Sequence, residues 1–204
     1  LPSLELIRRT QSSEHSHLTC NTREELRYNL KLVCKRNYGV LYFAFHGSPG
    51  RIHLHRDKIT LEELAEMMAG RFSNWIIHFG TCSTLRKPTA VTRFVEDTGV
   101  ALVTGFTKDV DWIESSAFEL LLFKAFHTWK SPKVVCKRLT TDYPDLAERT
   151  GFKFYPEFLK IILEKLPIFA VVFTFLLKLL FLLTHHIQED AFITWRVAQK
   201  HQQK

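Results

Sequence analysis

The sequence is poor in cysteine, and its few cysteines lie far apart. Cys20, Cys34, Cys82 and Cys136 form no CxxC pair. This spacing excludes a zinc knuckle and a dense disulfide framework. Because no basic and apolar leader opens the sequence, we also expect no secretory signal. We therefore expect a cytoplasmic protein with reduced thiols, at least one of which is available to react.

The sequence also lacks internal repeats, low-complexity segments and any block of five like charges. Of its 204 residues, 46% are hydrophobic and 24% are charged, which suits one globular domain and an additional segment. The net charge is +7, and basic residues recur every four positions at Arg23, Arg27, Lys31 and Lys35. We interpret this stripe as the solvated face of an amphipathic helix. Nucleic-acid binding is not expected, because no nucleic-acid motif or interleaved aromatic residue accompanies the stripe.

Helix and strand patterns alternate along residues 22–129. Thr22 with Glu25, and Thr60 with Glu63, have the spacing of capping boxes that begin two helices. Further helices are predicted at 88–98 and 114–129. Strands are predicted at 38–45, 51–55, 74–79 and 100–106, with Ile52 and Leu54 pointing inward. This alternation predicts an α/β domain with a mainly parallel sheet between helices.

Two apolar runs each end in a loop that carries a reactive type of side chain. "VLYFAF" leads to His46 and Gly47, and "NWIIHF" leads to the loop with Cys82. Ligands collect at the carboxyl ends of parallel strands, so we expect His46 and Cys82 on one rim. A histidine beside a cysteine lowers the pKa of the thiol and yields a nucleophilic thiolate. The backbone N–H groups of Gly47 and Cys82 could form an oxyanion hole.

The segments "VLYFAFHGSPG" and "NWIIHFGTCSTL" resemble the signature of caspase-like cysteine peptidases, which include caspases, gingipains, separases and bacterial CHAT domains. In these proteins one apolar strand ends in His-Gly, and a later one ends in a small residue and the nucleophilic cysteine. "ALVTGFTKDVDWIESSAFELLLFKAF" looks like the following strand, specificity loop and helix of CHAT-type domains. The resemblance covers residues 1–156 and is nearest to a poorly characterised bacterial family with the His-Gly and Gly-x-Cys-Ser signature.

The resemblance implies a three-layer caspase-like fold and a cysteine endopeptidase without a cofactor. His46 would be the general base and acid, Cys82 the nucleophile, and Gly47 an oxyanion-hole contributor. Asp109 or Asp111 would bind the substrate residue before the cut and favour Arg or Lys. The implied partners are a protein or peptide substrate and an upstream sensor or activating protein, in bacterial defence or cell death. The alternative is a catalytically silent caspase-like scaffold that acts as an interaction or membrane-acting effector module.

Two parts of the chain depart from the resemblance. Related domains begin with a further apolar strand, so residues 1–156 either lack that first strand or begin after it. Residues 157–204 have no counterpart and contain a run of eighteen residues, 166–183, with a single charge, Lys178. We expect this run to form a hydrophobic helix that either enters a membrane or is buried against the domain or in an oligomer.

The remaining histidines allow one competing interpretation. His53 and His55 lie on one face of a predicted strand and, with His46 or His78, could bind a metal ion. No carboxylate or thiol at a convincing spacing accompanies them, so we do not expect a metal site. His78 lies within an apolar strand and is expected to have a structural role.

Overall fold

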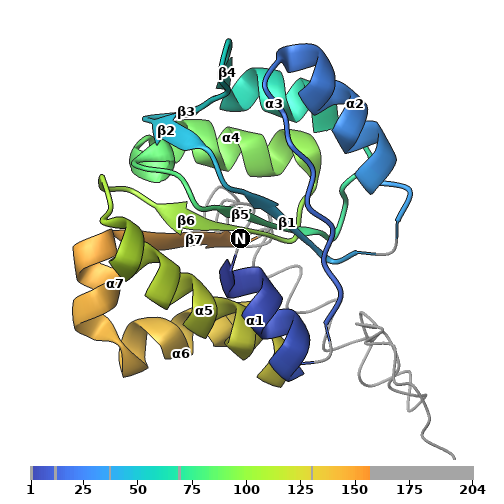
Figure 1. The fold of residues 1–204 in the computed structure, drawn as a ribbon. Helices are drawn as coiled ribbons and strands as arrows, with labels where there is room; N and C mark the ends of the chain where they lie inside the picture. The colour runs from blue at the N-terminus through green and yellow to red at the C-terminus, as the bar shows by residue number, and fades with distance from the viewer. Residues whose placement is uncertain (1, 12, 37, 69, 130, 157–204) are drawn as a thin grey trace, which may run out of the picture. The chain divides into compact units, whose positions relative to one another are not determined.

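The centre of the molecule is a four-stranded sheet with the strand order β1-β5-β6-β7 (Figure 1). The structure is a computed structural model that describes residues 2–11, 13–36, 38–68, 70–129 and 131–156. The strands of this sheet are β1 (Val40–Phe43), β5 (Ile76–Phe79), β6 (Leu102–Phe106) and β7 (Phe152–Pro156). β1, β5 and β6 are parallel, and β7 is antiparallel to β6. The predicted α/β class with a mainly parallel sheet is therefore confirmed, whereas β7 was not predicted.

A second, smaller sheet carries the histidine that follows β1. Its strands are β2 (His46–Ser48), β3 (Arg51–His53) and β4 (Lys58–Thr60), all antiparallel in the order β2-β3-β4. Ile52 and Leu54 are buried, as predicted. The predicted continuous strand at 38–45 was too long, because the central sheet ends at Phe43 and His46 begins β2.

Helices lie on both sides of the central sheet (Figure 1). On one side are α2 (Arg23–Val33), α3 (Leu61–Met68) and α4 (Pro88–Thr98). On the other side are α1 (Pro2–Gln11), α5 (Trp112–Thr128), α6 (Pro132–Asp142) and α7 (Pro144–Thr150). A single 3₁₀ turn, η1 (Thr84–Arg86), follows the loop after β5. Helix α5 begins two residues earlier than predicted, and α1, α6 and α7 were not predicted.

Local side-chain hydrogen bonds explain where two helices begin. The Thr22 hydroxyl accepts from the Glu25 N–H at 3.2 Å, and the Glu25 carboxylate accepts from the Thr22 N–H at 3.2 Å. Thr60 and Glu63 exchange the same two bonds before α3, at 3.2 and 2.8 Å. Both predicted capping boxes are therefore present, and each satisfies two N–H groups that the helix itself cannot bond.

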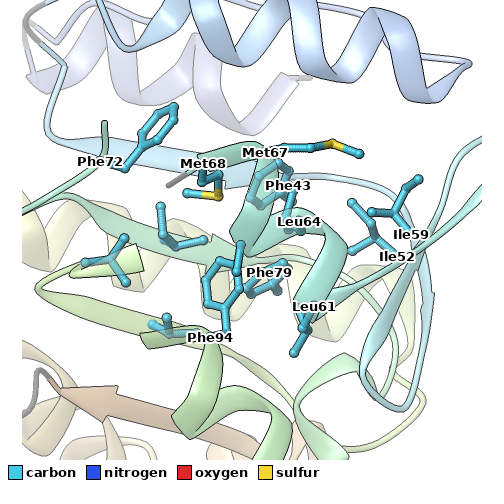
Figure 2. Packing of buried hydrophobic residues seen from close by; sticks show 14 of the residues in the cluster. Phe43, Ile52, Ile59, Leu61, Leu64, Met67, Met68, Phe72, Phe79 and Phe94 are labelled. Carbon is cyan, nitrogen blue, oxygen red and sulfur yellow. The ribbon is translucent and has the colours of Figure 1, made fainter. Parts of the chain in front are cut away.

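Alternation along the strands divides the buried side chains into two clusters, one on each face of the sheet. Figure 2 shows the cluster beneath α3 and α4, in which Phe43, Phe79 and Phe94 pack together. The opposite cluster contains Ile76 of β5, Leu102 and Phe106 of β6, and apolar residues of α5 and α6. With apolar cores on both faces, the strands are buried as parallel sheets require.

The sequence predicted a solvated basic stripe on the first capped helix and a hydrophobic helix at 166–183. Within the basic stripe, Arg23 forms an ion pair with Glu63 at 2.9 Å, while Arg27 and Lys31 are exposed on α2. Lys35 lies beyond the end of the helix. The hydrophobic run 166–183 and the tail to residue 204 lie outside the described residues. Among the helices that the structure describes, none combines the length and the apolar character needed to cross a membrane.

Candidate functional site

Matched strand ends bring His46 and Cys82 to the same edge of the sheet. Phe43, the last residue of β1, is the register partner of Phe79, the last residue of β5. His46 is the third residue after Phe43, and Cys82 is the third residue after Phe79. A hydrogen bond joins the two segments at the ends of the strands, where the Gly80 N–H donates to the Phe43 carbonyl at 3.0 Å. The segments that carry the two residues therefore leave neighbouring parallel strands at the same level of the sheet.

Hydrogen bonds tie the β2–β3 hairpin, which carries His46, to the loop that carries Cys82. The Gly50 N–H donates to the Thr84 carbonyl at 2.9 Å. The Thr84 hydroxyl donates to the Arg51 carbonyl at 3.0 Å and accepts from the Thr81 hydroxyl at 2.7 Å. The turn of the hairpin and residues 81–84 thus form one bonded unit.

Gly47 brings the two segments into contact at the position next to His46. A Cβ atom at residue 47 would lie 2.6 Å from the Cys82 carbonyl oxygen and 2.9 Å from Thr81 Cβ, and would also overlap Thr84 Oγ1. Real Cβ atoms do not approach other atoms this closely, so only glycine fits here. The sequence signal, a glycine directly after the histidine, therefore has a packing reason as well as the predicted role in an oxyanion hole.

The ladder of the small sheet determines where the Gly47 amide points. A backbone hydrogen bond closes each end of the β3–β4 ladder. The Leu61 N–H donates to the Gly50 carbonyl at 3.0 Å, and the Leu54 N–H donates to the Asp57 carbonyl at 2.8 Å. Since bonded pairs alternate in antiparallel ladders, Ile52 bonds to Ile59 on β4. The backbone N–H and carbonyl of Ile52 therefore point towards β4 and away from β2. Gly47, the register partner of Ile52 on β2, forms a non-hydrogen-bonded pair with it, so the Gly47 N–H points away from β3.

The backbone after Cys82 turns sharply. Ser83 is buried and has φ 47° and ψ 10°, in the left-handed region that costs a non-glycine residue about 1 kcal/mol or more. Its N–H donates to the Lys108 carbonyl at 2.8 Å, which holds this conformation and joins the Cys82 loop to the loop after β6. Within the described residues, the Cys82 N–H donates to no acceptor.

The imidazole of His46 is exposed, and Cys82 is half-buried. Within the described residues no hydrogen bond joins the two side chains. The His46 ring contacts the Trp112 ring, with centroids 6.2 Å apart in a T-shaped arrangement. Across the ladder from His46 is His53, whose Nε2 lies 2.8 Å from the Ser48 hydroxyl. Burial lowers the pKa of His53, and the positive charges of nearby Lys58 and Arg51 lower it further.

The predicted substrate-binding aspartates lie on the loop between β6 and α5. Asp111 is the N-cap of α5, and its Oδ1 accepts from the Ile113 and Glu114 N–H groups at 2.8 and 3.0 Å. Asp109 is exposed, with Oδ1 4.0 Å from Arg86. Both carboxylates therefore have local partners, and their binding of a substrate residue stays a prediction.

Sequence reasoning missed a buried polar cluster beneath the Cys82 loop. His78 is buried, with Nδ1 2.8 Å from the Thr104 hydroxyl and Nε2 3.2 Å from a carboxylate oxygen of buried Glu119. Tyr42 donates to the other Glu119 oxygen at 2.8 Å. The predicted structural role of His78 is thus explained by side-chain partners. Among the residues that the structure describes, no group of three or more His, Cys, Asp or Glu side chains could hold a metal ion.

Sequence comparison identifies the family to which the chain belongs. Residues 1–156 match the family described as "Family of unknown function (DUF6642)". Because this match spans more than half of the 204 residues, the chain belongs to that family. No curated protein matches the chain. The family's description assigns no chemistry, so the caspase-like resemblance stays a prediction.

Proposed function

We propose that this member of the family is a caspase-like cysteine endopeptidase that uses a dyad of His46 and Cys82. One observation carries the proposal: the hairpin that holds His46 is hydrogen-bonded to the loop that holds Cys82, at equivalent ends of neighbouring parallel strands. A thiol nucleophile needs a base that can come within hydrogen-bond reach of it. The joined segments support the proposal because they hold the two residues on neighbouring parts of the chain's fold.

In the proposed mechanism, His46 takes the proton of the Cys82 thiol, and the thiolate attacks the carbonyl carbon of a peptide bond. The oxygen becomes negatively charged in the tetrahedral intermediate, and two amides are suited to stabilise it: the Cys82 N–H and the Gly47 N–H, which points away from β3. His46 then protonates the leaving amine. A water molecule activated by His46 hydrolyses the acyl-enzyme and regenerates the thiol.

The missing hydrogen bond between His46 and Cys82 fits a resting enzyme, because catalytic hydrogen bonds are often long before substrate binds. In the proposal, a protein or peptide substrate or an upstream activating protein brings the two side chains together. The loop with Asp109 and Asp111 borders the site and would contact the substrate residue before the cut. The hydrophobic run 166–183 would hold the enzyme at a membrane, in a bacterial defence or cell-death system.

Labelling with an electrophilic peptide tests the proposal. We expect a peptidyl chloromethyl ketone to alkylate Cys82 of the full chain with loss of chloride. Mass spectrometry should find no modification of Cys34, a half-buried thiol on another part of the surface. His46→Ala should slow the labelling, and Cys82→Ala should remove both labelling and peptide cleavage while the melting temperature is kept. Cleavage that persists in folded Cys82→Ala would refute the assignment.

A catalytically silent scaffold is the second candidate, because the described residues show no hydrogen bond between His46 and Cys82 and a scaffold needs none. Such an effector would act by binding a partner or a membrane. It predicts that Cys82→Ala retains the biological effect of the chain, such as toxicity on expression, and that no electrophilic peptide labels Cys82. Loss of toxicity in Cys82→Ala with an unchanged amount of protein would exclude this candidate.

A further inference from the structure

A row of three polar residues crosses the central sheet: Tyr42 is half-buried, and His78 and Thr104 are buried. Tyr42 of β1 is the register partner of His78 of β5, and His78 is the register partner of Thr104 of β6. Glu119 of α5 completes the cluster from the helix layer, with one carboxylate oxygen towards Tyr42 at 2.8 Å and the other towards His78 at 3.2 Å. One side chain of α5 is therefore bonded to two neighbouring strands at the same height in the sheet.

This row lies directly beneath the segment that leads to Cys82. A Cβ atom at Gly80 would lie 2.5 Å from Glu119 Oε1 and 2.8 Å from the Tyr42 hydroxyl, and would also overlap the Tyr42 ring. The backbone of Gly80 therefore rests on the carboxylate and the phenol. Any displacement of Glu119 changes the support of a segment that reaches Cys82 two residues later.

The side chains around the row are apolar. Packing alone therefore does not explain why these positions hold polar residues. The His78 ring contacts the rings of Phe106 and Phe123, with centroids 5.8 and 5.6 Å apart. Replacing both partners of a buried hydrogen bond by apolar groups of the same shape can be nearly neutral or stabilising. Apolar residues would therefore serve packing equally well at these positions. The polar row adds directional hydrogen bonds, which fix the position of the Glu119 carboxylate relative to Gly80 and the strands.

The same face of α5 reaches the other half of the site. Trp112 precedes Glu119 by seven residues, which is two turns of helix, so the two side chains leave the same face. Trp112 is 75% exposed, and its ring contacts the His46 ring. Because most of the residue is in water, burial does not explain its position. The N-cap bonds of Asp111 fix the start of the helix and hence the place from which Trp112 projects.

We infer that one face of α5 braces both halves of the site, with Trp112 as a positioning residue for the His46 imidazole and Glu119 as a positioning residue for the Gly80–Cys82 segment. Neither residue takes part in bond making. Both act by setting the distance and orientation between imidazole and thiol. The inference rests on the proposed function, because it assumes that His46 and Cys82 work as a pair.

The pH dependence of Cys82 alkylation by iodoacetamide tests the brace without a substrate. In the wild-type chain we expect a rate profile that reports a thiol ionising beside His46. Trp112→Ala should lower the rate at neutral pH by between about tenfold and about 100-fold and move the profile to higher pH, because misplaced catalytic groups lose rates of this order. Trp112→Phe should restore most of the rate. Ile113→Ala is the matched control, since Ile113 is the next residue, is 81% exposed and should leave the profile unchanged.

Glu119 is tested by Glu119→Gln, and by Tyr42→Phe in case the buried glutamine prevents folding. Tyr42→Phe removes only the 2.8 Å bond to Glu119 and keeps the ring against Gly80. We expect both variants to slow the alkylation of Cys82 more than that of Cys34, which serves as the internal reference.

The outcomes separate the inference from the proposed function. If His46→Ala slows the alkylation but Trp112→Ala and Tyr42→Phe leave the pH profile unchanged, the brace is refuted and the dyad stands. If His46→Ala itself has no effect on Cys82, the dyad fails and the inference fails with it. Equal losses in Trp112→Ala and Ile113→Ala would also refute the brace, because they would reflect general exposure at the helix start.

Discussion

Replacing Gly47 by alanine perturbs the contact between the hairpin and the Cys82 loop with a single methyl group. Gly47 is not among the glycines with positive φ, so alanine meets no backbone strain there. The added Cβ would instead lie 2.6 Å from the Cys82 carbonyl oxygen and 2.9 Å from Thr81 Cβ. Two of the atoms nearest to the methyl group belong to the loop that carries Cys82, and one of them is backbone. The loop or the hairpin must therefore move.

Overpacking of this kind costs about 1–3 kcal/mol, since backbone must shift to relieve it. For a domain of this size, each kcal/mol lowers the melting temperature by about 2–4 °C. The displacement also separates the two amides proposed to bind the oxyanion. We therefore expect Gly47→Ala to fold with a lower melting temperature and to lose labelling of Cys82 by an electrophilic peptide.

Gly70→Ala provides the matched control. An alanine Cβ at Gly70 would meet no atom within 4 Å, but Gly70 has φ +68°, so alanine costs about 1–2 kcal/mol through backbone strain alone. This variant should lose similar stability and keep the labelling of Cys82. Calorimetry and mass spectrometry on both variants decide the matter. Full stability and full labelling in Gly47→Ala would refute the close contact of the two segments.

Two further predictions concern stability and thiol chemistry. Asp111→Ala should lower the free energy of unfolding by about 1 kcal/mol through loss of the helix cap. Asp109→Ala removes only an exposed ion pair with Arg86 and should change this free energy by less than about 0.5 kcal/mol. Equal losses for the two variants in urea titrations would contradict the role of the cap. Burial raises the pKa of Cys136 from 9.0 to about 12, so iodoacetamide at pH 8 should modify Cys82 and spare Cys136. Because the pKa of Cys136 is raised in the folded state, its neutral thiol contributes stability that is fully present below pH 9 and is lost as the pH rises towards 12. A free energy of unfolding that stays constant over this pH range would contradict the assignment.

The sequence predicted the elements whose signals are local. Thr22 and Thr60 each stand three residues before a glutamate, and both capping boxes form. Pro88 begins α4, and Gly99 ends it in the left-handed conformation. These signals work because the bonds that satisfy a helix end come from residues within one turn. Asp111, the cap of α5, has the same kind of local signal, since Glu114 follows three residues later.

Elements that depend on distant partners were predicted less well. The β7 segment, "FKFYP", becomes a strand through antiparallel pairing with β6, about fifty residues earlier in the chain. The break after Phe43 is also non-local, because His46 leaves the central sheet to pair with His53 of the hairpin. An unbroken apolar run cannot reveal which of two sheets its end will join. The prediction of His46 and Cys82 on one rim needed only the parallel arrangement of β1 and β5, which alternation supplies.

The polar row illustrates a different limit. Tyr42, His78 and Thr104 each lie in an apolar run, and each alone is a polar group whose burial without a partner costs about 1–3 kcal/mol. Only the register of three strands places them side by side, and only the packing of α5 brings Glu119 to them. Three such costs in adjacent strands are compatible with a stable fold only when the groups satisfy one another. A polar residue inside a predicted buried strand therefore indicates an unseen partner, and here the partner connects the sheet to the helix that contacts His46.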